Sequence, residues 1–111
     1  MSSAYITLLA NRTTDGTDGF VKWQRDSGGA MITAVGQVDV NGTFDGASVG
    51  FFYNKNGEEV AVHNASGAVA ITDNTQAFRL ALPHGEEIKA VVSSAGASTD
   101  IVCTITELRA I

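Results

Sequence analysis

The residues of this chain that could do chemistry are few, and each has an ordinary strand or turn as its context. Ser48 stands in GASVG, residues 46–50, which matches the letters of the G-x-S-x-G elbow of serine hydrolases. That elbow needs a strand before the serine and a helix after it. Here a turn precedes Ser48 and the apolar run 51–53 follows it, so we assign no nucleophile and expect no enzymatic activity.

Metal-binding side chains are equally sparse. His63 and His84 lie beside turns, where we expect solvated rings, and Cys103 is the single cysteine, so a thiolate metal site cannot form. The apolar run around Cys103 predicts a small buried hydrophobe. Asp15 and Asp18 are weak calcium candidates, because the sequence lacks the third acid and the terminal glutamate of a calcium loop. We therefore expect no metal and no cofactor.

Composition narrows the classes of partner. The chain has 111 residues, of which 44% are hydrophobic and 17% charged, and its net charge is −5. That length fits a single domain, residues 1–111, that buries a core without disulfides. An acidic chain without a lysine and arginine cluster repels nucleic acid and anionic membranes. Since the first residues lack the features of a signal peptide, we expect synthesis in the cytoplasm without secretion.

Short runs with alternating apolar residues, separated by glycine-rich and asparagine-rich turns, predict strands throughout the chain. The expected strands cover residues 4–10, 20–25, 30–40, 47–53, 58–63, 68–72, 76–82, 88–92 and 100–108. About eight or nine strands of this spacing are typical of an all-β antiparallel two-sheet sandwich or short barrel. Residues 1–10 are also a candidate for an N-terminal strand that interacts with a partner.

The stretch 38–59 is the expected centre of the fold. Val38, Val40, Val49, Phe51 and Tyr53 occupy every second position of their runs, share one face of each strand and should face the core. The glycine-rich segment 41–46 predicts a hairpin turn, and residues 30–63 together predict a three-strand meander. A glycine inside the first strand of the three, at position 36, indicates a bulge or a close approach of another group.

Phe52 should point away from the core, opposite to Phe51 and Tyr53. Contact with another subunit and cover by a loop or by the N-terminal strand explain it equally well. The candidate interface residues are Tyr5, Leu9, Phe52, Asn54, Lys55 and Asn56. As an alternative, Trp23 could form an exposed aromatic platform that binds carbohydrate.

Several segments together resemble small all-β structural proteins of tailed bacteriophages. The resemblance lies in GTFDGASV at 42–49, in Trp23 followed by Gly28-Gly29, in LPHG at 82–85 with IKAVVS at 88–93, and in the small-residue loop before the last strand. It implies a non-enzymatic virion protein on the capsid surface, a decoration (cement) protein that binds the major capsid protein, commonly as a trimer. A carbohydrate- or receptor-binding module of a tail or fibre is the alternative.

Overall fold

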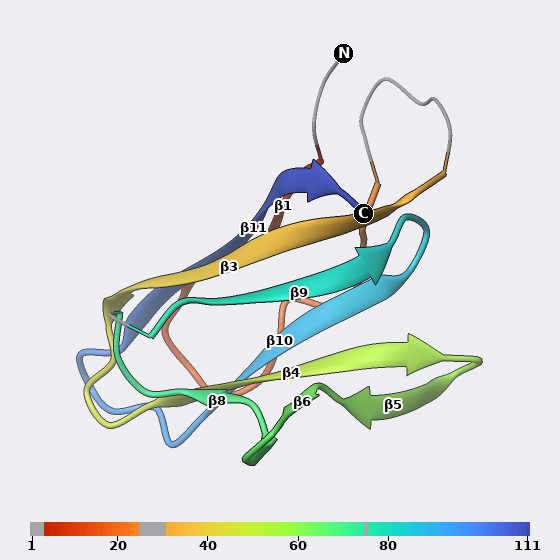
Figure 1. Ribbon diagram of the computed structural model, residues 1–111. Helices are drawn as coiled ribbons and strands as arrows, with labels where there is room; N and C mark the ends of the chain where they lie inside the picture. Colours follow the sequence, from red (N-terminus) through yellow and green to blue (C-terminus); the bar gives the residue numbers. More distant parts are fainter. Residues whose placement is uncertain (1–3, 25–30, 75) are drawn as a thin grey trace.

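The chain folds into packed antiparallel β-sheets in a computed structural model that describes residues 4–24, 31–74 and 76–111 (Figure 1). The strands are β1 (Tyr5–Arg12), β2 (Val21–Lys22), β3 (Thr33–Thr43), β4 (Ser48–Lys55), β5 (Glu58–Ala61), β6 (His63–Asn64), β7 (Gly67–Ala68), β8 (Ala70–Ile71), β9 (Phe78–Pro83), β10 (Glu87–Ser93) and β11 (Asp100–Ala110). The all-β prediction is confirmed, and the sheets form a sandwich, not a closed barrel. The strands outnumber those expected because two predicted strands are each divided: residues 58–63 fall on β5 and β6, and residues 68–72 fall on β7 and β8.

Two sheets make the layers of the sandwich. The first sheet has the strand order β1-β11-β3-β9, and the second has the order β2-β10-β4-β5 with β8 also paired to β4. The strands β6 and β7 form a separate small ribbon. Phe78 on β9 meets Phe51 on β4 edge to face, with ring centroids 5.1 Å apart, so these aromatic rings join the two layers.

The core lies between the sheets, where the alternation of side chains predicts it. On the long strands β3 and β11, alternate residues are buried and the residues between them are half-exposed. The predicted core residues Val38, Val40, Val49 and Phe51 are all buried, and Tyr53 is half-buried. The largest fully buried side chains are Trp23, Phe51, Leu8, Leu9, Ile88, Ile101, Ile105, Val38, Val49, Val92 and Cys103.

The predicted three-strand meander is wrong in one respect, because β3 and β4 belong to different sheets. Asn41 and Gly42 continue β3, and the reversal comes at Asp45-Gly46, whose φ angles are 47° and 85°. Phe44 is buried beside this reversal, and Ala47 N–H donates to its carbonyl at 2.9 Å. The turn that contains the buried Phe44 side chain therefore connects the first sheet to the second.

The second predicted turn does form a hairpin. Strands β4 and β5 pair directly, and the positive φ angles of Asn56 (55°) and Gly57 (89°) suit the tight connection between them. Residues 1–3 of the candidate N-terminal strand lie outside the described residues, and so do the Gly28-Gly29 pair of the resemblance and positions 25 and 30 at the ends of two expected strands.

Candidate functional site

The last residues of β11 lie beside the first residues of β1 and β3, at one end of the sandwich (Figure 1). Most of the large apolar side chains that are exposed in the described residues belong to these strand ends or to residues next to them. Among the described residues, Tyr5, Met31, Leu108 and Ile111 are 59%, 64%, 42% and 76% exposed, and we call this set the apolar end. Tyr5 pairs with Thr106, two residues before Leu108, and Ile111 N–H donates to Thr33 O at 2.9 Å, two residues after Met31. Neighbouring strand ends therefore present these side chains together.

Two candidate interface residues lie on β1, and the structure separates them. Tyr5 belongs to the apolar end, whereas Leu9 is fully buried and cannot reach a partner. The β1–β11 register shifts between Thr7 and Leu9 and again between Leu9 and Arg12. Because a bulge breaks the two-residue alternation, Leu8 and Leu9 are both buried, and the prediction of an accessible Leu9 is wrong.

Phe52 points away from the core as predicted, since it pairs with Lys89 and Ala61 on the outer face of the second sheet. It is half-buried. A Cβ atom placed on Gly50 would lie 3.8 Å from Phe52 Cε1, so the ring lies over that glycine of its own strand. Phe52 is thus partly covered from within the sheet and offers only part of its ring to a partner.

The turn between β4 and β5 holds the remaining interface candidates. Asn54 Oδ1 accepts a hydrogen bond from Gly57 N–H at 2.9 Å within the hairpin, and its Nδ2 donates to Glu87 of β10 at 2.8 Å, so both ends of its amide are already engaged. Lys55 pairs with Glu86 at 2.5 Å, and its side chain is 49% exposed. Asn56 is exposed. Lys55 and Asn56 are therefore the members of this group that a partner could reach.

Trp23 is fully buried, so the prediction of an exposed aromatic platform at this residue is wrong. Its Nε1–H donates to Leu82 O at 3.0 Å, which satisfies the indole inside the core. A Cβ on Gly36 would lie 3.2 Å from Trp23 Cη2 and 2.7 Å from Ile105 Cγ2, so Gly36 marks a close approach, as its position in the strand indicated. The Trp23 ring can pack in this position because residue 36 has no side chain.

Beside Trp23 lies a buried polar pair that the sequence reasoning missed. His84 Nε2 is 3.0 Å from Glu107 Oε1, and the two side chains are 2% and 3% exposed. Ile32 N–H lies 3.5 Å from His84 Nδ1, and Ala4 N–H donates to Glu107 Oε1 at 3.3 Å. The prediction of a solvated His84 is wrong. The sequence did indicate that Glu107 is buried, because residues 101, 103 and 105 face the core and Glu107 is the next residue in that alternation.

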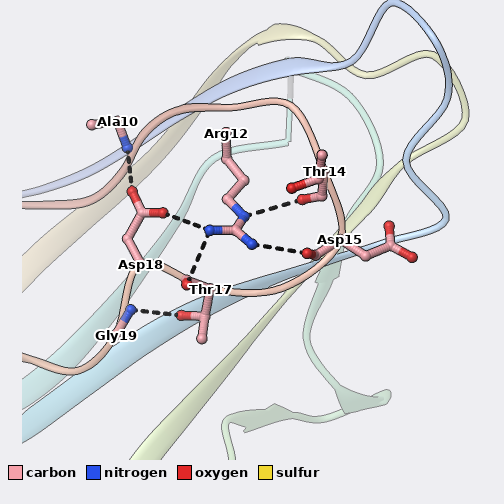
Figure 2. A network of polar contacts seen from close by, with 7 residues as sticks. All are labelled: Ala10, Arg12, Thr14, Asp15, Thr17, Asp18 and Gly19. Atoms are coloured by element: carbon pink, nitrogen blue, oxygen red, sulfur yellow. Dashed lines mark hydrogen bonds and ion pairs between the residues drawn. The ribbon is translucent and has the colours of Figure 1, made fainter.

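The calcium candidates Asp15 and Asp18 lie in a loop that a guanidinium already fills (Figure 2). Arg12 donates to the carbonyl oxygens of Thr14, Asp15 and Thr17 at 3.1, 2.8 and 3.1 Å, and to Asp18 Oδ1 at 3.1 Å. These are the oxygens that a calcium ion in this loop would need. The side chain of Asp15 is also engaged, because its Oδ1 accepts a hydrogen bond from Ala95 N–H at 2.8 Å.

Cys103 is fully buried, as predicted. Burial in the core, and secondarily the charge of Asp39, raises the pKa of its thiol to about 12 from an ordinary 9.0. A thiol with so high a pKa stays protonated, and the thiolate is the form that reacts. Cys103 therefore acts as a packing residue.

Over the parts of the chain that the structure describes, no pocket is found, and no three or more His, Cys, Asp or Glu residues are grouped to hold a metal ion. Within the described residues, no helix occurs that is long and apolar enough to span a membrane. In comparisons with known proteins, no family model, no curated protein and no solved structure matches this chain.

Proposed function

We propose that this chain is a non-enzymatic structural protein of a bacteriophage virion, a decoration protein that binds the major capsid protein. It is made in the host cytoplasm, acts on the capsid surface and stabilises contacts between neighbouring capsid subunits. In this proposal it works as a homo-oligomer, for which the resemblance favours a trimer. Support comes from the phage-like segments at 42–49 and 82–93 and from the sandwich fold that such a protein is expected to have.

The observation that carries the proposal is the apolar end. Of the five large hydrophobic side chains exposed among the described residues, all but Val60 belong to it. An apolar patch kept in water is typical of a surface that binds another protein, and tyrosine and methionine are both enriched in such interfaces. Arg109 on β11 is exposed beside this patch and can hydrogen-bond a partner at its rim.

Binding at this end would stabilise the capsid by mass action. A protein that binds only the assembled lattice shifts the equilibrium away from the dissociated subunits, by an amount set by its concentration relative to its Kd. A decoration protein needs no catalytic group for that effect. It needs a rigid surface, which the packed core and the paired strands beneath the apolar end provide.

The experiment compares the melting temperatures of capsids that carry the wild-type protein, no protein or a variant. We expect the wild-type protein to raise the melting temperature, and Tyr5→Ser combined with Leu108→Ser to lose binding. The matched control is Val60→Ser, which removes an exposed apolar side chain outside the apolar end and should leave binding unchanged. Equal melting of bare and decorated capsids would contradict the cementing role, and equal loss from the control would contradict the assigned surface.

A further inference from the structure

The outer edge of β9 is open in the described part of the chain. Only β3 pairs with β9, in a register that runs without shifts from Thr33↔Pro83 to Val38↔Phe78. His84 N–H donates to Ile32 O at 2.8 Å and continues that ladder. Because hydrogen bonding alternates along an antiparallel pair, residues 78, 80 and 82 bond to β3. The N–H and C=O groups of Arg79 and Ala81 therefore point to the open edge.

The other edges of the two sheets are less suited to pairing. Strand β1 carries two register shifts, which distort its edge, and β2 has two residues. Strand β5 begins with Glu58 and Glu59, both exposed, and acidic side chains at an edge discourage association. Strand β9 has six residues, a regular register and one charged side chain.

We propose that β9 pairs with β9 of a second copy of this chain, antiparallel, about a twofold axis that passes beside Leu80. In this register Arg79 lies opposite Ala81 of the second copy, and Ala81 lies opposite Arg79. Both residues then exchange both backbone hydrogen bonds, so every outward group of the pair finds a partner. The first sheets of the two copies become one continuous sheet, through an isologous interface.

The side chains agree with this register. Leu80 is half-buried on the inner face and meets its own copy at the axis, which covers apolar surface that the single chain leaves partly in water. On the outer face Arg79 stands beside Ala81, so no like charges meet. Arg79 Nε donates to Gln37 at 3.3 Å and holds its side chain back over its own sheet.

The neighbouring twofold registers fit less well. An axis at Arg79 would place the two guanidinium groups opposite each other, which is unfavourable. An axis at Ala81 would place Arg79 opposite Pro83, which has no backbone N–H to donate. The axis at Leu80 is thus selected by charge and by hydrogen bonding together.

This inference does not depend on the virion role, because it concerns the purified chain alone. The contact is one that the free chain makes with a second copy and is separate from the trimer that the resemblance implies on the capsid, since an isologous contact closes with two copies. The test is sedimentation equilibrium of the full chain at concentrations up to about 1 mM, where weak complexes form. We expect the mass to rise from 11.5 kDa toward twice that value.

Ala81→Pro is the first variant. It removes the outward N–H of residue 81 and leaves the ladder between β3 and β9 intact, because that N–H does not bond to β3. We expect the variant to remain a monomer at all concentrations, and the control Ala81→Ser, which keeps the N–H, to associate like wild type. Circular dichroism and thermal melting show whether each variant is folded.

A charge series tests the register without altering the backbone. In the proposed dimer, Ala81→Glu faces Arg79 of the second copy and should tighten association roughly 2- to 30-fold, since two cross-strand ion pairs form. Ala81→Arg should weaken association by a similar factor. Adding Arg79→Glu to Ala81→Arg restores opposite charges and should restore dimerisation.

Three results would overturn the proposal. A wild-type chain that stays monomeric up to the highest concentration excludes self-pairing. A trimer, or a dimer that Ala81→Pro leaves unchanged, places the contact elsewhere on the surface. A charge series in which Ala81→Glu and Ala81→Arg behave alike contradicts the register, even if Ala81→Pro fails to fold.

Discussion

At the scale of single residues, parts of the core have no room for a larger side chain or for a charge. Gly36, Trp23 and Ile105 fill one region of the core so closely that one more carbon atom at position 36 meets the other two side chains. Cys103 has no solvent exposure, and its thiol is in a place where the charged form is unfavourable. Both residues give predictions that need only the purified protein.

Gly36→Ala should lower the free energy of unfolding by about 1–3 kcal/mol, because overpacking forces core side chains from their preferred positions. Urea unfolding followed by tryptophan fluorescence measures the change. Gly50→Ala is the matched control, since a Cβ there meets only ordinary contacts of 3.8 and 4.0 Å. If both variants unfold at the same urea concentration, the packing of Trp23 over Gly36 is not tight.

Cys103 should make the protein less stable in alkali. Its folded pKa of about 12 lies above the ordinary 9.0, so above about pH 9 the unfolded chain loses the thiol proton while the folded chain keeps it. The contribution of the thiol to the free energy of unfolding is fully present below pH 9 and is lost as pH rises toward 12, by up to about 1.4 kcal/mol for each pH unit.

The measurement for Cys103 is urea unfolding at several values above about pH 9, for wild type and for Cys103→Ala. Burial, and secondarily the charge of Glu86, raises the pKa of Tyr53 from 10.0, and this group titrates in both proteins, so it cancels in the comparison. We expect a steeper decline for wild type. Parallel declines would show that the thiol titrates alike in both states.

At the scale of elements, the loop between β1 and β2 is ordered by one side chain. The Arg12 guanidinium donates hydrogen bonds to the loop carbonyls and to Asp18 (Figure 2). The backbones of Gly16 and Val92 exchange hydrogen bonds of 2.9 and 2.8 Å. The loop therefore connects β1 of the first sheet to β10 of the second. The planar fork of arginine, with several donors, suits this arrangement.

Arg12→Ala should lower the free energy of unfolding by about 1–3 kcal/mol, since carbonyl oxygens lose charged donors. Arg12→Lys should recover less than half of the loss, because an ammonium group cannot reproduce the fork. Hydrogen exchange at the Gly16 and Val92 amides should accelerate in both variants. Arg109→Ala is the control on an exposed strand end, and exchange rates that do not change in Arg12→Ala would contradict the role assigned to Arg12.

The sequence predicts much of the fold at this scale, for a physical reason. Strict alternation identifies the buried residues of β3 and β11, because one face of each strand lies on the core. It does not reveal that β3 and β4 belong to different sheets, since a turn that crosses the sandwich uses the same glycine and aspartate residues as a hairpin. Nor does it reveal the bulge that buries Leu9, which depends on pairing with β11.

The candidate site was harder to predict than the fold. Tyr5 was correctly placed at the surface, but exposure of Leu108 and Ile111 depends on where β11 leaves the core, which no local pattern shows. An exposed Trp23 was the alternative prediction, and its burial depends on a glycine on a distant strand, Gly36, which no local pattern shows. Contacts between residues far apart in sequence decide each of these cases.

At the scale of the whole molecule, the His84–Glu107 pair joins separate parts of the chain. His84 belongs to the turn after β9, Glu107 to β11, and Ala4 N–H, just before β1, donates to the same carboxylate. The site is buried beside Trp23, at the end of the sandwich that carries the apolar end. Because the two side chains are buried and hydrogen-bonded to each other, the effects of their mutations on the free energy of unfolding should not add.

His84→Leu and Glu107→Leu should each lower the free energy of unfolding by about 1–3 kcal/mol, because each removes the buried hydrogen bond between the two side chains. The loss should be larger for Glu107→Leu, which also removes the acceptor of Ala4 N–H. The double variant should lose less than the sum of the two. The exposed His63→Leu should change stability by no more than about 0.5 kcal/mol, and strict additivity would contradict the coupling.

The pairing of β1 with β11 has a consequence for biosynthesis. Tyr5 lies opposite Thr106, so β1 leaves the ribosome long before its neighbour in the sheet exists. At about 5–20 residues per second, the strand waits roughly 5–20 s with its apolar Leu8 and Leu9 uncovered. The first sheet can close only when translation reaches β11, so folding is completed late and a nascent chain paused before β11 should be a target for chaperones.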